Sequence, residues 1–242
     1  MRYYYDLHIH TALSPCAEDD MTPNNIARMA GLKGLDIIAV TDHNTALNAP
    51  AVMAAAARLG GPLVIPGMEL ETEEEVHILL LFETAEGALA CGEEVAKKLL
   101  PVENRPDIYG RQLVLDREDN VIAAHKQLLT VSAGIGVYEA AALAGRHGGI
   151  AIPAHIYRPA HGIIATLLDV PPDMGFSAVE TTFPNDGARM AAWEERGYGA
   201  LHDSDAHALA LIAERGADNW FELEALSVGH VLAHLKRFVP NK

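Results

Sequence analysis

Asp6-Leu7-His8-Ile9-His10-Thr11 stands close to the start of the sequence. We interpret it as a short strand in which His8 and His10 share one face while Leu7 and Ile9 share the other, because side chains alternate along a strand. Two adjacent imidazoles make a poor hydrophobic core but a good half of a metal site. The other half of such a site has to come from elsewhere in the chain.

Apolar runs that end in polar residues recur along the chain, and helical stretches separate most of them. The runs cover residues 3–10, 36–40, 63–66, 76–82, 149–155, 178–182 and 199–202. The alternation of strands with helices predicts a parallel sheet. About seven such units favour a closed or nearly closed α/β barrel, in which chemistry gathers at the carboxyl ends of the strands.

Residues 101–134 interrupt this rhythm. Their prolines, glycines and charges predict an irregular insertion after the fourth strand. A short hairpin is expected within it, pairing residues 112–115 with residues 121–124. We interpret the whole of 1–242 as a single domain, because barrels of about this length often form one domain.

The charge balance narrows the class of partner. The 18 Lys and Arg residues face 33 Asp and Glu residues, for a formal net charge of −15. Proteins that hold nucleic acid by its phosphates normally carry a basic patch, and the sequence has no Lys/Arg cluster, so nucleic acid is an unfavoured partner. No apolar run approaches the roughly 20 residues that span a bilayer, and no signal peptide is recognisable. Cys16 and Cys91 offer no disulfide framework, so a cytoplasmic location is expected.

Residues able to bind metal follow the ends of the predicted strands. They are His8, His10, Asp42, His43, Glu69, His77, His155, Asp203, Asp205 and His207. A lone His beside an apolar run is usually a core or surface residue. Recurrence at one end of successive strands is hard to explain that way, because a barrel would collect all these side chains in one mouth. The sequence therefore predicts a metal centre rich in His and carboxylate.

Five motifs, in a fixed order, carry a family resemblance. They are Asp6-Leu7-His8-Ile9-His10-Thr11, Thr41-Asp42-His43-Asn44, Gly67-Met68-Glu69 with Val76-His77-Ile78, Pro153-Ala154-His155, and Ser204-Asp205-Ala206-His207. Together they resemble the PHP (polymerase and histidinol phosphatase) family over residues 6–207. The resemblance implies a distorted (β/α)7 barrel with a trinuclear metal centre.

The resemblance also implies which residues bind which metal. The first metal would be held by His8, His10, Glu69 and Asp205. Glu69 would bridge to a second metal held by His77 and His155. The third metal would be held by His43 and His207, with one more ligand from the loop formed by residues 14–20.

The loop 14–20 departs from the family pattern, which places a His or Asp there. Cys16 falls where some members have a His, and Asp19 and Asp20 follow it. Asp20 is the preferred ligand, because a hard carboxylate suits Mn, Fe or Mg as well as Zn. Asp19 and Cys16 are the alternatives.

The expected chemistry is that of a multi-metal hydrolase. Mixed His and carboxylate ligands suit Zn, Mn or Fe, with Mg as a further candidate, and two or three divalent ions are expected per chain. Two metals that share a carboxylate hold a bridging hydroxide, which would attack phosphorus. Asp42 and Asp203 are expected to orient the ligand imidazoles. Arg158, with its planar fork, or His161 would contact the substrate phosphate.

Metal-dependent hydrolysis of a small phosphorylated molecule is the function expected from these residues. One rival is a nuclease of the same family acting on nucleic acid ends or lesions, which would need a basic path to the site. Another is a C–N hydrolase of the amidohydrolase type. Such enzymes commonly bridge their metals with a carbamylated lysine, and no lysine ends a predicted strand. The near-complete ligand set argues against a third rival, a catalytically silent metal-binding domain.

Overall fold

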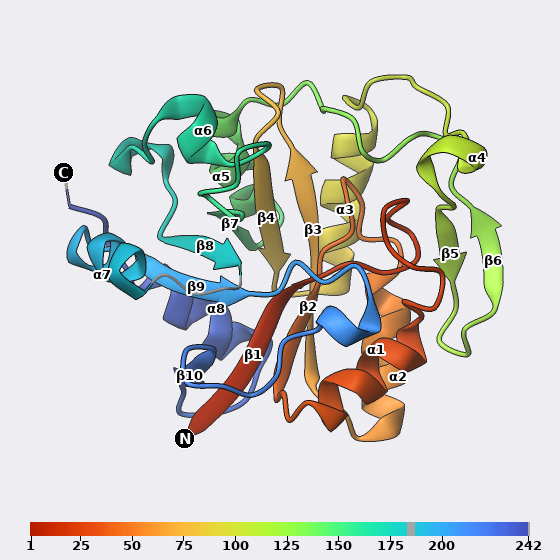
Figure 1. Cartoon of the computed structure of the whole chain (residues 1–242), viewed down its shortest axis with the longest axis horizontal. Coiled ribbons are helices and arrows are strands. Elements are labelled where there is room, and N and C mark those ends of the chain that lie inside the picture. The colour runs from red at the N-terminus through yellow and green to blue at the C-terminus, as the bar shows by residue number, and fades with distance from the viewer. Residues whose placement is uncertain (183–186, 242) are drawn as a thin grey trace.

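The computed structural model describes residues 1–182 and 187–241 and shows a mixed α/β fold (Figure 1). Its main sheet curls into a half-barrel with strand order β10-β1-β2-β3-β4-β7. These strands are β1 (Arg2–Ile9), β2 (Ile37–Val40), β3 (Leu63–Glu71), β4 (His77–Phe82), β7 (Gly149–Pro153) and β10 (Trp220–Glu222). A second, two-stranded sheet pairs β8 (Ala178–Thr182) with β9 (Gly199–Asp203).

The strands of the main sheet do not all run in one direction. β1, β2 and β3 are parallel neighbours, as the helices between them lead one to expect. β4, in contrast, is antiparallel to both β3 and β7. The turn from β3 to β4 is short, with Thr72 N donating to the Val76 carbonyl. The expectation of a parallel sheet is therefore wrong at β4, because a parallel pair needs a long crossover connection. It is also wrong at β10, which is antiparallel to β1.

β8 and β9 lie between β7 and β1 and complete the curl without a continuous ladder. On one side, Ile156 N, just after β7, donates to the Glu180 carbonyl of β8 at 3.0 Å. On the other side, the Asp203 carboxylate at the end of β9 accepts from Leu7 N of β1 at 2.6 Å. Just after β9, Ala206 forms an isolated parallel bridge with Ile9, so β1 and β9 are joined by a side-chain contact and a single bridge, without a ladder.

Buried apolar side chains form one layer on each face of the main sheet, and alternate residues of β4, such as Leu79 and Leu80, enter different layers. The layer that contains Leu80 includes Cys91, and the layer that contains Leu79 includes Val231. The helices are α1 (Pro23–Leu32), α2 (Ala49–Leu59), α3 (Ala85–Ala96), α5 (Val137–Arg146), α6 (Ile163–Leu167), α7 (Gly187–Glu195) and α8 (Val228–Lys236). Among the described residues, no helix combines the length and the apolar character needed to cross a membrane.

The segment 101–134 holds a short helix, α4 (Pro106–Tyr109), and a hairpin of β5 (Leu113–Leu115) and β6 (Val121–Ala124). The hairpin expected from the sequence is thus confirmed. The segment is tied to the loops that leave β1 and β2, because Leu113 N donates to the Ala12 carbonyl and Asn44 Nδ2 donates to the Leu129 carbonyl. It therefore lies beside the carboxyl ends of those strands (Figure 1).

Candidate metal centre

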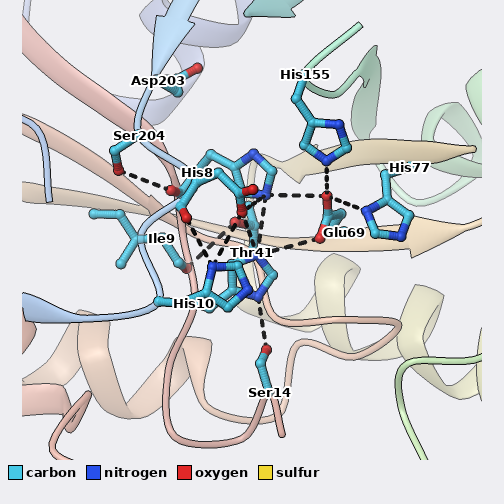
Figure 2. Close-up of polar contacts among 12 residues, drawn as sticks. His8, Ile9, His10, Ser14, Thr41, Glu69, His77, His155, Asp203 and Ser204 are labelled. Atoms are coloured by element: carbon cyan, nitrogen blue, oxygen red, sulfur yellow. Dashed lines mark hydrogen bonds and ion pairs between the residues drawn. The ribbon is translucent and has the colours of Figure 1, made fainter. Parts of the chain in front are cut away.

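His8 and His10 lie at the carboxyl end of β1, and both are fully buried. Their Nε2 atoms are 3.2 Å apart. Each Nε2 lies 3.3 Å from a Glu69 oxygen (Figure 2) and 3.3 Å from Asp205 Oδ1. The two imidazoles on one strand face thus meet two carboxylates from other parts of the chain, and the four residues place ligand atoms within 4.8 Å of one another.

Glu69, on β3, is the middle of the site. Its carboxylate also faces His43 Nδ1 at 3.0 Å, His77 Nδ1 at 2.8 Å and His155 Nε2 at 3.0 Å. Burial would raise the pKa of this carboxyl, but the imidazoles around it, His77 foremost, hold the pKa well below its usual range. Glu69 is therefore a carboxylate at neutral pH, with its two oxygens turned toward different imidazoles. We call the set that it joins the central cluster: His8, His10, His43, Glu69, His77, His155, Asp205 and His207.

The imidazoles of the central cluster differ in how readily they lose a proton. Burial lowers the pKa of His43 to about 4 and that of His207 to about 3, so both rings are neutral at pH 7. Burial opposes charge on His77 as well, but Glu69 and then Glu71 outweigh it and raise the pKa of His77 to about 9. A metal that binds His77 must therefore displace a proton.

Several residues at the site adopt a backbone conformation that side chains other than glycine disfavour. The φ angles of Asn44, His155 and Asp205 are 53°, 29° and 53°. Each such residue costs on the order of 1–3 kcal/mol and persists only where surrounding contacts enforce it. Asp205, for example, is held through its Oδ2 by Arg158 Nη1 at 2.7 Å. Strain of this kind is concentrated at functional sites, where it aims side chains.

The third predicted metal site is assembled only in part. His43 and His207 come together with His10, with ligand atoms within 4.8 Å of one another. The preferred loop ligand, Asp20, is not brought to them, because it is exposed at the entry to α1. Its carbonyl oxygen accepts from Thr22 N and from Asn25 Nδ2 there. The placement of Asp20 in the site is therefore a prediction that the structure does not support.

The other two loop candidates differ from each other. Asp19 forms a forked ion pair with Arg111, with 3.0 Å between Nε and Oδ2. Cys16 is exposed as a residue. Even so, desolvation of its thiol, followed by the charge of Glu69, raises the pKa of the thiol to about 12. The thiol of Cys16 therefore senses the charge of the central cluster.

Asp42 and Asp203, which are expected to orient ligand imidazoles, lie behind the central cluster and differ in what they hold. Asp42 accepts from Ser14 Oγ at 2.7 Å, and that hydroxyl lies 2.9 Å from His10 Nδ1. Asp42 therefore orients His10 through Ser14. Asp203 holds the backbone of β1 at Leu7 N.

Glu180 is a site residue that the sequence motifs did not reveal. Its Oε1 lies 2.9 Å from His8 Nδ1, and its Oε2 accepts from His155 N at 2.6 Å. It thus fixes the ring of one ligand and the backbone of another. The signal in the sequence was a lone acid inside the apolar strand around Val179, where a buried carboxylate needs a partner.

Arg158 and His161 both lie beside the cluster, on the loop after β7. Arg158 is half exposed and contacts Asp205. His161 stacks on His77, with ring centroids 4.3 Å apart and an interplanar angle of 17°. Its Nδ1 lies 3.1 Å from the Glu75 carbonyl oxygen.

Known proteins provide three comparisons. An uncharacterized protein of Methanocaldococcus jannaschii is 32% identical over 100 residues, which cover 38% of this chain and 58% of the relative. The lesion-specific endonuclease PfuEndoQ of Pyrococcus furiosus matches with a TM-score of 0.71 and 19% identity, over 98% of this chain and 56% of that one. A protein of Bifidobacterium adolescentis described as a metal-dependent phosphoesterase matches with a TM-score of 0.60 and 17% identity. The match covers 89% of this chain and 91% of that one. This chain thus spans little more than half the length of the first two.

The family assignment rests on a match that covers most of the chain. The PHP domain matches residues 6–180. That range begins at the motif that carries His8 and His10, takes in Glu69, and ends at Glu180 on β8. The protein therefore belongs to the PHP domain family.

Proposed function

We propose that the protein is a metal-dependent phosphoesterase that hydrolyses a small phosphorylated substrate. The observation that carries the proposal is the convergence on Glu69. Ring nitrogens lie within 3.3 Å of its carboxylate in His8, His10, His43, His77 and His155. Buried imidazoles and carboxylates in such numbers are costly unless a cation pairs with them.

The donor atoms of the central cluster fit divalent metal ions. Asp205 Oδ1 and Glu69 Oε2 are buried without a hydrogen-bond partner. We assign His8, His10, Glu69 and Asp205 to a first ion, Glu69, His77 and His155 to a second, and His43 and His207 to a third. This mixed set suits Zn, Mn or Fe. When bound, these ions would supply a hydroxide nucleophile at neutral pH and would neutralise charge on the phosphoryl oxygens.

Arg158 supplies the cationic contact that a phosphate requires. One of its N–H groups is engaged by Asp205 Oδ2. A guanidinium carries five N–H donors in a planar fork, so the others remain available to phosphate oxygens. Arg158 would thus hold the phosphoryl group against the Asp205 side of the central cluster.

The charge around the segment 101–134 supports a small substrate over nucleic acid. Three of its arginines are each paired with an acid. The pairs are Arg105 with Asp107, Arg111 with Asp19, and Arg117 with Glu118. Each pair offsets positive charge that the arginine would otherwise offer to a nucleic acid backbone, in a chain whose net charge is already −15.

Phosphate release by protein reconstituted with Zn or Mn tests the proposal. The panel contains sugar phosphates, nucleotides, histidinol phosphate and short oligonucleotides with and without a lesion. We expect turnover of a small phosphate ester by the wild type and none by Asp205→Asn. Turnover confined to oligonucleotides would favour the nuclease function, and absence of turnover with metals bound would contradict the proposal.

A further inference from the structure

A second group of ligand atoms lies beside the central cluster and shares one residue with it. Glu71 ends β3, His77 begins β4, and His161 lies on the loop after β7. Their ligand atoms lie within 4.8 Å of one another. We call this group the outer site.

His77 turns one ring nitrogen to each site. Nδ1 lies 2.8 Å from Glu69 Oε1, while Nε2 lies 3.6 Å from Glu71 Oε2 (Figure 2 shows the ring reaching Glu69). His77 is only 5% exposed, and both of its ring nitrogens are buried without a hydrogen-bond partner. Once the ring gives up its proton, each nitrogen can bind a cation on its own side.

His161 offers its Nε2 to the same site. The Glu75 carbonyl oxygen, 3.1 Å from Nδ1, can only accept a hydrogen bond, so Nδ1 carries the hydrogen and Nε2 keeps its lone pair. The backbone fixes the position of His161 relative to His77, because His77 N donates to the His161 carbonyl at 2.9 Å. The stacked rings are therefore held together by both main chain and side chains.

Glu71 supplies the negative charge of the outer site. The residue is 7% exposed. Ser132 Oγ donates to its Oε1 at 3.1 Å, and Asn44 Oδ1 accepts from its backbone N at 2.9 Å. Ser132 fixes the carboxyl group, Asn44 fixes the backbone of the same residue, and Oε2 is left to face His77. A buried carboxylate beside two imidazole lone pairs is stabilised when a cation joins them.

We propose that Glu71, His77 and His161 bind a divalent cation of the zinc type at the outer site. Two imidazoles and one carboxylate form a common zinc ligand set in proteins. Nδ1 of His161 is already held by the Glu75 carbonyl oxygen, which is how proteins orient metal-binding histidines. Nδ1 of His77 faces Glu69 in the set assigned to the second ion, so His77 would bridge the two ions as an imidazolate and link this cation to the central cluster.

Zinc-soaked crystals of the full chain test the proposal directly, because anomalous scattering locates each zinc ion separately. We expect a peak about 2.0–2.2 Å from Glu71 Oε2 and from Nε2 of His77 and His161. The peak should vanish in Glu71→Gln and in His161→Gln while peaks in the central cluster remain. Glu74→Gln is the matched control, because Glu74 lies in the same turn and accepts from Val137 N instead.

A solution measurement excludes binding that occurs only in the crystal. Adding zinc alone should shift the ¹⁵N resonance of His161 Nε2 in the wild type and in Glu74→Gln, but not in Glu71→Gln. Thermal unfolding of the metal-free variants identifies any that fail to fold. Filled central sites with no peak between Glu71 and His161, or an unmoved His161 resonance, would overturn the proposal. The outcome is separable from that of the phosphoesterase proposal, because neither measurement involves turnover.

Discussion

Side chains on paired strands and side chains on loops arrive at the site in different ways. Glu69 and His77 lie on β3 and β4, whose mutual register sets the face to which each side chain points. Asp20 lies on the loop 14–20, where no ladder sets a direction, and it faces solvent. The comparison teaches that a ligand position follows from the sequence where strand alternation applies, and depends on loop geometry elsewhere.

Replacing the central strand residue should have the largest effect. Glu69→Gln keeps the volume but removes the charge that faces five imidazoles. We expect phosphoesterase activity to fall by about 10³-fold or more, because several kcal/mol of metal-derived stabilisation are lost. Metal content and phosphate release measure the effect, with exposed Glu83→Gln, just after β4, as the control. Full metal content and activity in Glu69→Gln would refute the central role of Glu69.

The strand-borne His77 and the loop-borne His43 should differ in their response to pH. The pKa of His77 is raised to about 9 in the metal-free protein, whereas that of His43 is lowered to about 4. Below pH 9 a proton on His77 competes with the metal, so zinc affinity should rise between pH 7 and pH 9 by up to about tenfold per unit. Zinc titrations in chelator buffers measure the slope. The slope should become shallower in His77→Gln and stay unchanged in His43→Gln, and equal slopes in all three proteins would contradict this assignment.

The Glu180→Gln variant tests whether a strand residue that orients metal ligands matters as much as the ligands themselves. Glu180→Gln weakens the hold on His8 Nδ1 and on His155 N. We expect metal affinity to fall about 10–100-fold, the usual cost of losing the group behind a ligand. Equilibrium dialysis measures it, and Glu222→Gln at the exposed end of β10 is the control. Affinity equal to that of the wild type would show that His8 is oriented by other contacts.

Arg158 extends the comparison to a loop residue that does reach the site. Arg158→Ala should lower kcat/KM for a phosphorylated substrate about tenfold or more, because a hydrogen bond to a charged group contributes about 1.5–3 kcal/mol. Metal content should stay at the wild-type value. Arg158→Lys keeps the charge without the fork, so an intermediate value is expected. An unchanged kcat/KM in the alanine variant would remove Arg158 from phosphate binding.

How much of the structure the sequence alone predicts differs between the fold and the site. The alternation of apolar runs with helices predicts the parallel strands β1 to β3, and the five motifs place His8, Glu69 and Asp205 together. The antiparallel β4 was not foreseen, because a run of apolar residues carries no sign of direction. Glu180 was missed for a related reason: one acid in a buried strand does not say which partner it will meet.

Replacing Asp20 should have the smallest effect on metal content and activity. The same replacement bears most directly on the difference between ligands on strands and ligands on loops. Its side chain is exposed, and the contacts that hold this turn go to its carbonyl oxygen. Asp20→Asn should therefore leave metal content and activity within about twofold of the wild type, as surface substitutions usually do. Cys16→Ser is the informative partner variant, because the thiol of Cys16 responds to the charge of Glu69. If Asp20→Asn lost one metal while Cys16→Ser kept all of them, the loop 14–20 would have to rearrange when metal binds, and its ligand would be the one that the sequence favoured.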